Sequence, residues 1–307
     1  MKYFFLYYHN LTEFVRGINT YNLVKNKIIL SFILSCCFSY ADNQWLTLTK
    51  NQELTISGMA TFKNGYIVVH DNKTPDQPYV SYIDDKYNFK KINWDRKSKN
   101  VFPFDLEGLT RIPLYLNQFI LMESSGKCFR VKVDPENLKM SLVEVFRLPF
   151  VTKEHNLEGI ELQLISGVYF IVYGDRGSDN RPSTLFTGKY NVETNKVSDV
   201  SSFIISFPKP KTNKRNIADL AIDKSNNLWA AATSDPGDIG PFQTFIYKVG
   251  SFSNSGDLII KKPLFPKLFF KGQKVEALMV SDNLLYMMTD NESFGASFLK
   301  ISNSDIR

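Results

Sequence analysis

The sequence repeats a two-strand pattern at intervals of 50 to 61 residues, and this period restricts the fold more than any other feature. Each copy has an apolar segment with an acidic and a small residue, then a turn, then a second apolar segment that ends near an acid. The copies begin at Ile56, Leu106, Leu157, Ile217 and Val275. Short apolar segments joined by turns that contain Asn or Gly predict β-hairpins.

Further strand-like segments follow the hairpins in most copies. The third segments are 128–133, 184–190, 244–249 and 297–301, and the fourth are 143–146, 200–205 and 258–261. Four antiparallel strands at this period predict an all-β protein whose units are the blades of a β-propeller. The spacing favours a five-bladed propeller over two alternatives, a six-bladed ring and two packed β-sandwiches.

The last copy is one strand short, because the residues after Glu276 suffice for only three strands. The segment Trp45–Thr49 precedes the first copy, and we expect it to supply the missing outer strand. Pairing the two ends of the chain would close the ring and remove exposed sheet edges. The sequence therefore predicts one propeller domain over residues 42–307.

Residues 1–41 have the features of a signal peptide. Lysines precede the apolar run Ile28–Cys37, and small residues occupy the two positions that a signal peptidase reads before a cut after Ala41. The run is about half of the roughly 20 residues that a spanning helix needs. We expect a periplasmic or secreted protein with no transmembrane anchor after cleavage, and a lipid anchor through Cys36 is the alternative.

The charge distribution argues against a nucleic-acid partner. The formal net charge is +6, and the first 41 residues contribute half of it. The remainder has no basic tract with interleaved aromatic residues, and the short run Lys209–Arg215 is expected to be a solvated loop. We expect a monomer whose partner is a small anionic ligand or another protein.

Propeller topology predicts one face of the ring at which acidic residues gather. The first strand of each blade starts at the face to which the second strand returns, so residues at these two places converge on one mouth of the central channel. The first strands contribute Glu107, Glu158, Asp219 and Glu276, and the second strands and their loops contribute Asp175, Arg176, Asp235 and Asp290. Loops on a rigid scaffold commonly carry binding groups.

A ring of carboxylates is unfavourable unless cations neutralise it or some of the acids stay protonated. Calcium accepts about six to eight oxygen ligands in irregular geometry. The candidate calcium ligands are Glu107, Glu158, Asp219 and Glu276. In the structural alternative, the same acids accept backbone N–H groups from the neighbouring blade and lock the ring. Both interpretations stay open at this point.

The loop Asp175–Arg181 places two arginines beside the acidic ring. Guanidinium groups bind phosphate or carboxylate through paired hydrogen bonds, although Arg176 could instead pair with a neighbouring acid across the turn. His70 and His155 are expected at the same mouth, where either could transfer protons. The usual serine-hydrolase, zinc-protease, P-loop and dinucleotide-binding motifs are not found in the sequence.

The repeated Leu-Glu-Gly-Leu phrase, together with Tyr173–Gly177 and Thr289–Glu292, resembles the esterase-like phytase propeller families of exported bacterial proteins. The resemblance covers residues 55–302. It implies a propeller, an exported location, and calcium or phosphoester chemistry.

The sequence departs from this family pattern at three positions. Ser57 replaces the acid in the first copy, and Ala218 and Ala277 replace glycine. Two functions therefore stay open. The first is a non-catalytic module that binds a ligand or partner at the acidic mouth, and the second is a calcium-dependent phosphoesterase.

Overall fold

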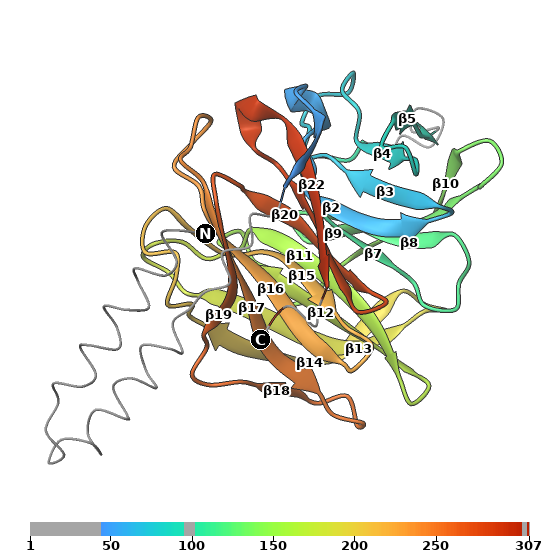
Figure 1. Cartoon of the computed structure of the whole chain (residues 1–307). Coiled ribbons are helices and arrows are strands. Elements are labelled where there is room, and N and C mark those ends of the chain that lie inside the picture. Colours follow the sequence, from blue (N-terminus) through green and yellow to red (C-terminus); the bar gives the residue numbers. More distant parts are fainter. Residues whose placement is uncertain (1–43, 95–101, 303–305, 307) are drawn as a thin grey trace, which may run out of the picture. The chain divides into compact units, whose positions relative to one another are not determined.

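Every strand in the described part of the chain belongs to one of five sheets, which form the blades of a β-propeller (Figure 1). The computed structural model describes residues 44–94, 102–302 and 306. Its helical elements within these ranges are two 3₁₀ turns, η2 (Gln52–Leu54) and η3 (Glu292–Phe294). The predicted all-β, five-bladed fold is therefore confirmed.

The predicted signal peptide, residues 1–41, and the alternative lipid anchor at Cys36 lie outside the described residues. Among the residues that are described, no helix is both long enough and apolar enough to cross a membrane. Export of the protein stays a prediction.

Each blade starts with a strand near the channel and continues outward. Blade 1 contains β2 (Gly58–Phe62), β3 (Gly65–Val69), β4 (Val80–Ile83) and β5 (Phe89–Lys91). Blade 2 contains β7 (Leu106–Arg111), β8 (Gln118–Glu123), β9 (Lys127–Val133) and β10 (Lys139–Arg147). Blade 3 contains β11 (Leu157–Ile165), β12 (Val168–Asp175), β13 (Ser183–Asn191) and β14 (Lys196–Ile205).

Blade 4 contains β15 (Lys214–Ile222), β16 (Asn227–Ser234), β17 (Gln243–Phe252) and β18 (Leu258–Ile260). Blade 5 contains β20 (Val275–Ser281), β21 (Leu284–Thr289), β22 (Ala296–Ser302) and the N-terminal strand β1 (Leu46–Thr49). The first strands lie near the middle of Figure 1, and outer strands such as β5, β10 and β18 lie towards its edge.

Two blades have a fifth strand that the repeat pattern does not predict. The segment that leaves blade 1 forms β6 (Asn93–Trp94), which pairs in parallel with β10 of blade 2. Trp94 then contacts Phe129 edge to face, with 5.9 Å between ring centroids. In blade 4, β19 (Pro266–Lys271) shares the outer edge of β17 with β18. These additions come from connecting segments, which carry no repeat signal.

The ring closes as predicted, through the N-terminal strand. β1 pairs antiparallel with β22, and Leu46 lies opposite Phe298. The first strands of successive blades contact one another around the whole ring, including β20 with β2. Pairing the two ends of the chain leaves no gap between the last blade and the first.

The hydrophobic core consists of five clusters, and each lies between two neighbouring blades. The cluster between blades 5 and 1 includes Ile56, Val68 and Met288, all fully buried. Because every blade packs on both of its neighbours, the ring holds the first strands in fixed positions around the channel.

The small residue of the repeat lies where adjacent blades touch most closely. A Cβ atom at Gly159 would lie 2.8 Å from the backbone nitrogen of Leu220 in the next blade. At Gly108, the closest atoms would be the Cγ2 methyl of Ile160 and the Cε methyl of Met122, at 2.9 and 3.0 Å. Backbone moves aside less readily than a side chain, so Gly159 tolerates an added Cβ atom less well than Gly108 does.

Gly159→Ala is therefore expected to destabilise the propeller by about 1–3 kcal/mol, the usual cost of overpacking a close contact. Gly108→Ala should cost less, because the Cε methyl of Met122 can rotate away and the Ile160 side chain can shift more readily than backbone. Urea denaturation of the two variants and the wild type measures both effects. An equal cost at the two glycines would contradict the argument.

Candidate ligand site at the channel mouth

β-Bulges turn three of the predicted acids away from the regular strand pairing. The register of the first hairpin shifts at Glu107 in blade 2, at Glu158 in blade 3 and at Glu276 in blade 5. A bulge re-aims the side chain of the extra residue. All three side chains belong to residues that are at most 6% exposed, so their charges lie in a largely dehydrated space.

Asp219 lies one position further along its strand than the other acids. In blade 4 the small residue Ala218 precedes the acid, whereas in blade 3 Glu158 precedes Gly159. Asp219 thus occupies the register of Gly159 and faces the next blade, where its Oδ2 accepts the N–H of Leu278 at 2.6 Å. Burial raises the pKa of Asp219 well above its usual value, although this hydrogen bond opposes the shift. Asp219 therefore has the structural role given above as the alternative to calcium binding, because it accepts a backbone N–H group of the neighbouring blade.

Arg215 is a central residue of the mouth that lies outside the predicted set. Its Nη1 lies 3.4 Å from Oε1 of Glu158 and 3.2 Å from Oε1 of Glu276. Its Nη2 lies 2.6 Å from Oδ2 of Asp235. The prediction that Lys209–Arg215 is a solvated loop is wrong for its last two residues, because Lys214 and Arg215 belong to β15. Arg215 therefore connects acids from blades 3, 4 and 5.

Lys274 is a second basic residue outside the predicted set, and it is 1% exposed. Its Nζ lies 3.3 Å from Glu276, 3.3 Å from Asp290 and 3.6 Å from Asp235, and it also pairs with Glu292. Burial alone would lower the pKa of Lys274, but the charges of Glu276 and Asp290 raise it well above its usual value. Lys274 is thus a permanent cation that neutralises this side of the mouth.

The two arginines of the loop after β12 have different partners. Arg181 binds Asp175 with both Nη atoms, and the distance from Nη2 to Oδ1 is 2.9 Å. Arg176 donates from Nη1 to Oε1 of Glu158 at 3.1 Å. The side chain of Arg176 is 32% exposed, so part of its guanidinium group faces solvent beside the acidic ring.

The opposite side of the mouth has an excess of negative charge. Carboxylate oxygens of Asp71, Asp105 and Glu107 lie within 4.8 Å of one another. The basic partner of this cluster is Lys73, whose Nζ lies 2.9 Å from Asp105. Burial, and then the charge of Asp290, raise the pKa of Asp71 to about 6. These three carboxylates are hereafter called the acidic cluster.

Glu107 belongs to the acidic cluster and also borders the ring. Burial, and then the charge of Glu158, raise the pKa of Glu107 well above its usual value. Glu158 is fully buried, and its Oε2 has no hydrogen-bond partner among the described residues. A buried carboxylate oxygen without a partner is costly, so this atom marks a position where a ligand would be stabilising.

The two histidines expected at the mouth do not contact its carboxylates in the described part of the chain. His70 is fully buried, with Nδ1 2.6 Å from the carbonyl of Thr55 and Nε2 2.9 Å from Oγ of Ser81. Burial lowers the pKa of His70 to about 4, which keeps the ring neutral. His155 accepts the N–H of Thr152 at 3.0 Å in a surface loop.

The mouth thus has two electrostatically different sides. The compensated side holds Glu158, Asp235, Glu276 and Asp290 around Arg215 and Lys274. The acidic cluster forms the other side, and Glu107 is the predicted residue that belongs to it. Asp105 and Lys73 were not predicted, and their one sequence signal is their closeness to Glu107 and Asp71 along the chain.

Comparisons with known proteins identify no family for this chain. No protein-family model matches the sequence, and no curated protein matches it. A β-1,2-mannobiose phosphorylase from Listeria innocua, solved with β-1,2-mannobiose, has a TM-score of 0.47 at 8% identity, with 89% of this chain and 94% of that chain covered.

Two further structures have comparable scores. The Bacteroides ovatus protein described as xyloglucan PUL GH43B has a TM-score of 0.49 at 12% identity, with 84% of this chain and 54% of that chain covered. The Dos1 propeller has a TM-score of 0.41 at 12% identity, with 85% and 63% covered. At these identities and TM-scores the likeness does not extend to activity or ligand, and the β-propeller fold is established by the sheet topology of the chain itself.

Proposed function

We propose that this protein is a ligand-binding propeller that holds a calcium ion at the acidic cluster and binds a small anionic ligand through it. The observation that carries the proposal is the contrast between the two sides of the mouth. Arg215 and Lys274 form ion pairs with the acids of one side, whereas Lys73 is the one cation that pairs directly with the acidic cluster in the described part of the chain. A divalent cation would supply the missing positive charge.

Calcium suits these donors for chemical reasons. The cluster offers carboxylate oxygens alone, which are hard ligands, and calcium tolerates irregular geometry and open coordination positions. Oε2 of Glu158 has no hydrogen-bond partner among the described residues and would supply a further ligand oxygen. Among the neighbouring charges, Glu158 has the largest effect on the pKa of Glu107, which ties this oxygen to the acidic cluster. This set differs from the predicted ring, because Glu276 is paired with cations and Asp219 with a backbone N–H.

The ligand is expected to be anionic because positive groups would border the occupied site. A bound calcium ion retains positions for ligand oxygens, and Arg176 presents a partly exposed guanidinium group beside Glu158. Guanidinium groups bind phosphate and carboxylate well. The proposal includes export of the protein, as the predicted signal peptide implies.

A calcium-dependent phosphoesterase is the second candidate function. It is supported by the resemblance to esterase-like phytase families and by the position of Arg176 near the acids. Against it, neither histidine is placed as a base at the mouth, because His70 is buried and neutral and His155 hydrogen-bonds to Thr152 in a surface loop. We therefore favour binding without turnover.

Calorimetric titration with calcium chloride, after treatment with a chelator, tests the proposal. The wild type should bind one ion at the cluster, and Asp71→Asn combined with Glu107→Gln should abolish that binding, because two of three carboxylates are lost. The control is Glu136→Gln with Glu144→Gln, which removes two exposed acids of blade 2. Absence of calcium binding by the wild type, or equal loss in the control, would disprove the cation site.

The same preparations should then be assayed with a panel of phosphomonoesters, with calcium and with chelator. Binding without hydrolysis supports the binding module. Hydrolysis that requires calcium and is lost in the Asp71→Asn/Glu107→Gln variant would establish the phosphoesterase instead.

A further inference from the structure

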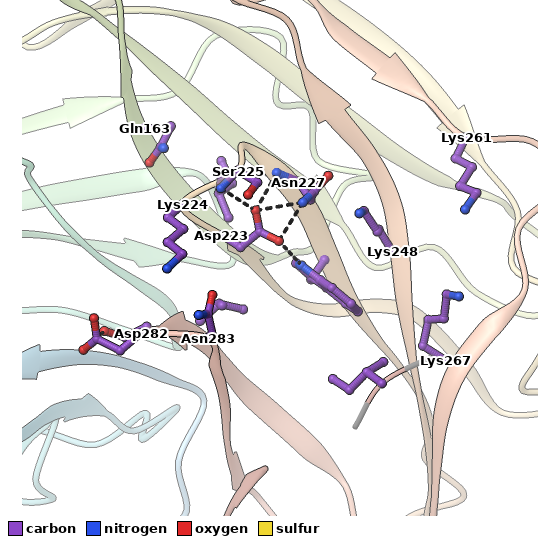
Figure 2. A pocket seen from close by; sticks show the side chains of 15 residues that line it. Gln163, Asp223, Lys224, Ser225, Asn227, Lys248, Lys261, Lys267, Asp282 and Asn283 are labelled. Atoms are coloured by element: carbon purple, nitrogen blue, oxygen red, sulfur yellow. Dashed lines mark hydrogen bonds between the residues drawn. The ribbon is translucent and has the colours of Figure 1, made fainter. Parts of the chain in front are cut away.

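A second polar pocket lies between blades 4 and 5, at the opposite end of their strands from the mouth (Figure 2). It borders the turns that join β15 to β16 and β20 to β21. Its volume is about 650 Å³, within the range of about 300–1,000 Å³ that is usual for small-molecule sites. This pocket is separate from the proposed calcium site.

Four lysines line the pocket, and no acidic side chain in the described ranges forms an ion pair with them. They are Lys224, Lys248, Lys261 and Lys267. Lys248 and Lys267 are half-buried. In Figure 2, Lys248, Lys261 and Lys267 lie along one side, and Lys224 lies on the other. Like charges held together without counter-charges repel one another, so a bound anion would stabilise the arrangement.

The outer part of blade 4 fixes the three lysines that lie together. β17 changes partner at Lys248, because the residues before it pair with β19 and those after it pair with β18. Lys261 directly follows β18, and its N–H donates to the carbonyl of Val249 at 2.8 Å. Lys267 belongs to β19. Sheet pairing therefore fixes the backbone of Lys248 and Lys261, and Lys267 lies at a register shift between the paired residues Pro266 and Leu268.

The two acids that line the pocket form no ion pair with these lysines in the described part of the chain. Asp223 is buried and accepts hydrogen bonds from the backbone of Ser225 and Asn227, both at 2.9 Å, and from the indole of Trp229 at 3.0 Å. The oxygens of Asp223 are therefore occupied by hydrogen bonds within its own hairpin, as the dashed lines in Figure 2 show. Asp282 is exposed and lies on the side of Lys224 in Figure 2.

We infer that this pocket binds a small polyanion that carries phosphate or sulfate groups. Lysine ammonium groups are compact charges that bind such oxyanions without the planar geometry that arginine requires. Trp229 is 4% exposed, so the pocket offers little aromatic surface on which an uncharged sugar could stack. Charge, rather than stacking, would select the ligand.

Calorimetric titration with sodium pyrophosphate, at low salt and without divalent ions, tests this inference. The wild type should bind, and Lys248→Gln combined with Lys267→Gln should raise the Kd at least about tenfold, because two charge-assisted contacts are lost. Added sodium chloride should weaken binding by screening. Parallel titrations with sulfate and with citrate show whether phosphate, sulfate or carboxylate is preferred.

The matched control is Lys139→Gln with Lys196→Gln, which removes two exposed lysines of blades 2 and 3. It should leave the Kd within about twofold, because these lysines lie outside the pocket. A nonspecific attraction that depended on net charge alone would be weakened equally by both pairs of substitutions. If the first pair fails to fold, Lys224→Gln with Lys261→Gln, both exposed, should also raise the Kd. No binding by the wild type, an equal loss in the control, or an unchanged Kd in the pocket variants would overturn the inference.

Discussion

Lys274→Met is expected to destabilise the propeller by about 3–5 kcal/mol, the usual cost of removing one partner from a buried ion-pair network. The ammonium group of Lys274 is 1% exposed and lies 3.3 Å from both Glu276 and Asp290. Methionine fills much of the same space but leaves these carboxylates with Arg215 as the remaining nearby cation. Urea denaturation at pH 8, in chelator, measures the loss.

The loss of unfolding free energy caused by Lys274→Met should become smaller as the pH falls from 8 to 5. Burial already raises the pKa of Glu276 above its unfolded value, and Lys274 opposes that rise. Without Lys274 the pKa of Glu276 in the folded state rises further, so the charged form of Glu276 weakens the fold at high pH. Protonation at low pH removes the penalty, because the folded state then binds the proton more tightly than the unfolded chain.

Lys189→Met is the matched control for this experiment. Its ammonium group lies 2.9 Å from Asp199, but both side chains are at least half exposed. Exposed pairs are worth about 0–1 kcal/mol, so the control should lose little stability at either pH. Equal losses for the two variants would show that the Lys274 network does not support the fold.

The five-bladed ring could be predicted because each blade repeats the same physical requirement. The first strands of blades 1 to 3 have a glycine where the next blade approaches, as Gly159 shows, and every hairpin needs apolar faces that pack on both neighbours. The closing strand followed from counting strands. β6 and β19 could not be predicted in this way, since their short segments serve one blade each.

The candidate site was less predictable, because charge balance depends on contacts between blades. Topology predicted where Glu158, Glu276 and Asp290 would gather, but no local pattern shows that Arg215 and Lys274 point among them. Both lie directly at the start of a first strand or just before it, which is the same place along the blade as the acids. That placement along the blade is visible in the sequence, but the sequence does not show toward which side these basic side chains point.

Asp219 shows how a single exchange of neighbours alters a role. The acid and the small residue are in the reverse order in blade 4, so the carboxylate takes the place that faces the next blade. Side chains of adjacent strand residues point to opposite sides, and one position is enough to convert a mouth residue into an inter-blade contact. A pattern that records only composition does not distinguish these cases.

Calcium is expected to stabilise the wild type by about 2.7 kcal/mol at a hundredfold excess over its Kd, or roughly 5–10 °C in melting temperature. Asp71→Asn with Glu107→Gln should abolish this calcium-dependent shift. The same change should raise the calcium-free stability above pH 6, because the pKa of Asp71 is raised to about 6 and its charged form weakens the fold there. Melting curves with calcium and with chelator measure both effects.

Glu158→Gln with Glu276→Gln should behave in the opposite way. Arg215 binds both carboxylates, at 3.4 and 3.2 Å, so this variant leaves a largely buried guanidinium group with Asp235 alone. Stability should fall both with calcium and with chelator, and most of the calcium-dependent shift should remain. If this variant instead loses the shift while Asp71→Asn/Glu107→Gln keeps it, the ion sits in the ring of Glu158 and Glu276. The acidic cluster would then be an unneutralised surface of the channel, and the contrast between the two sides of the mouth would need another explanation.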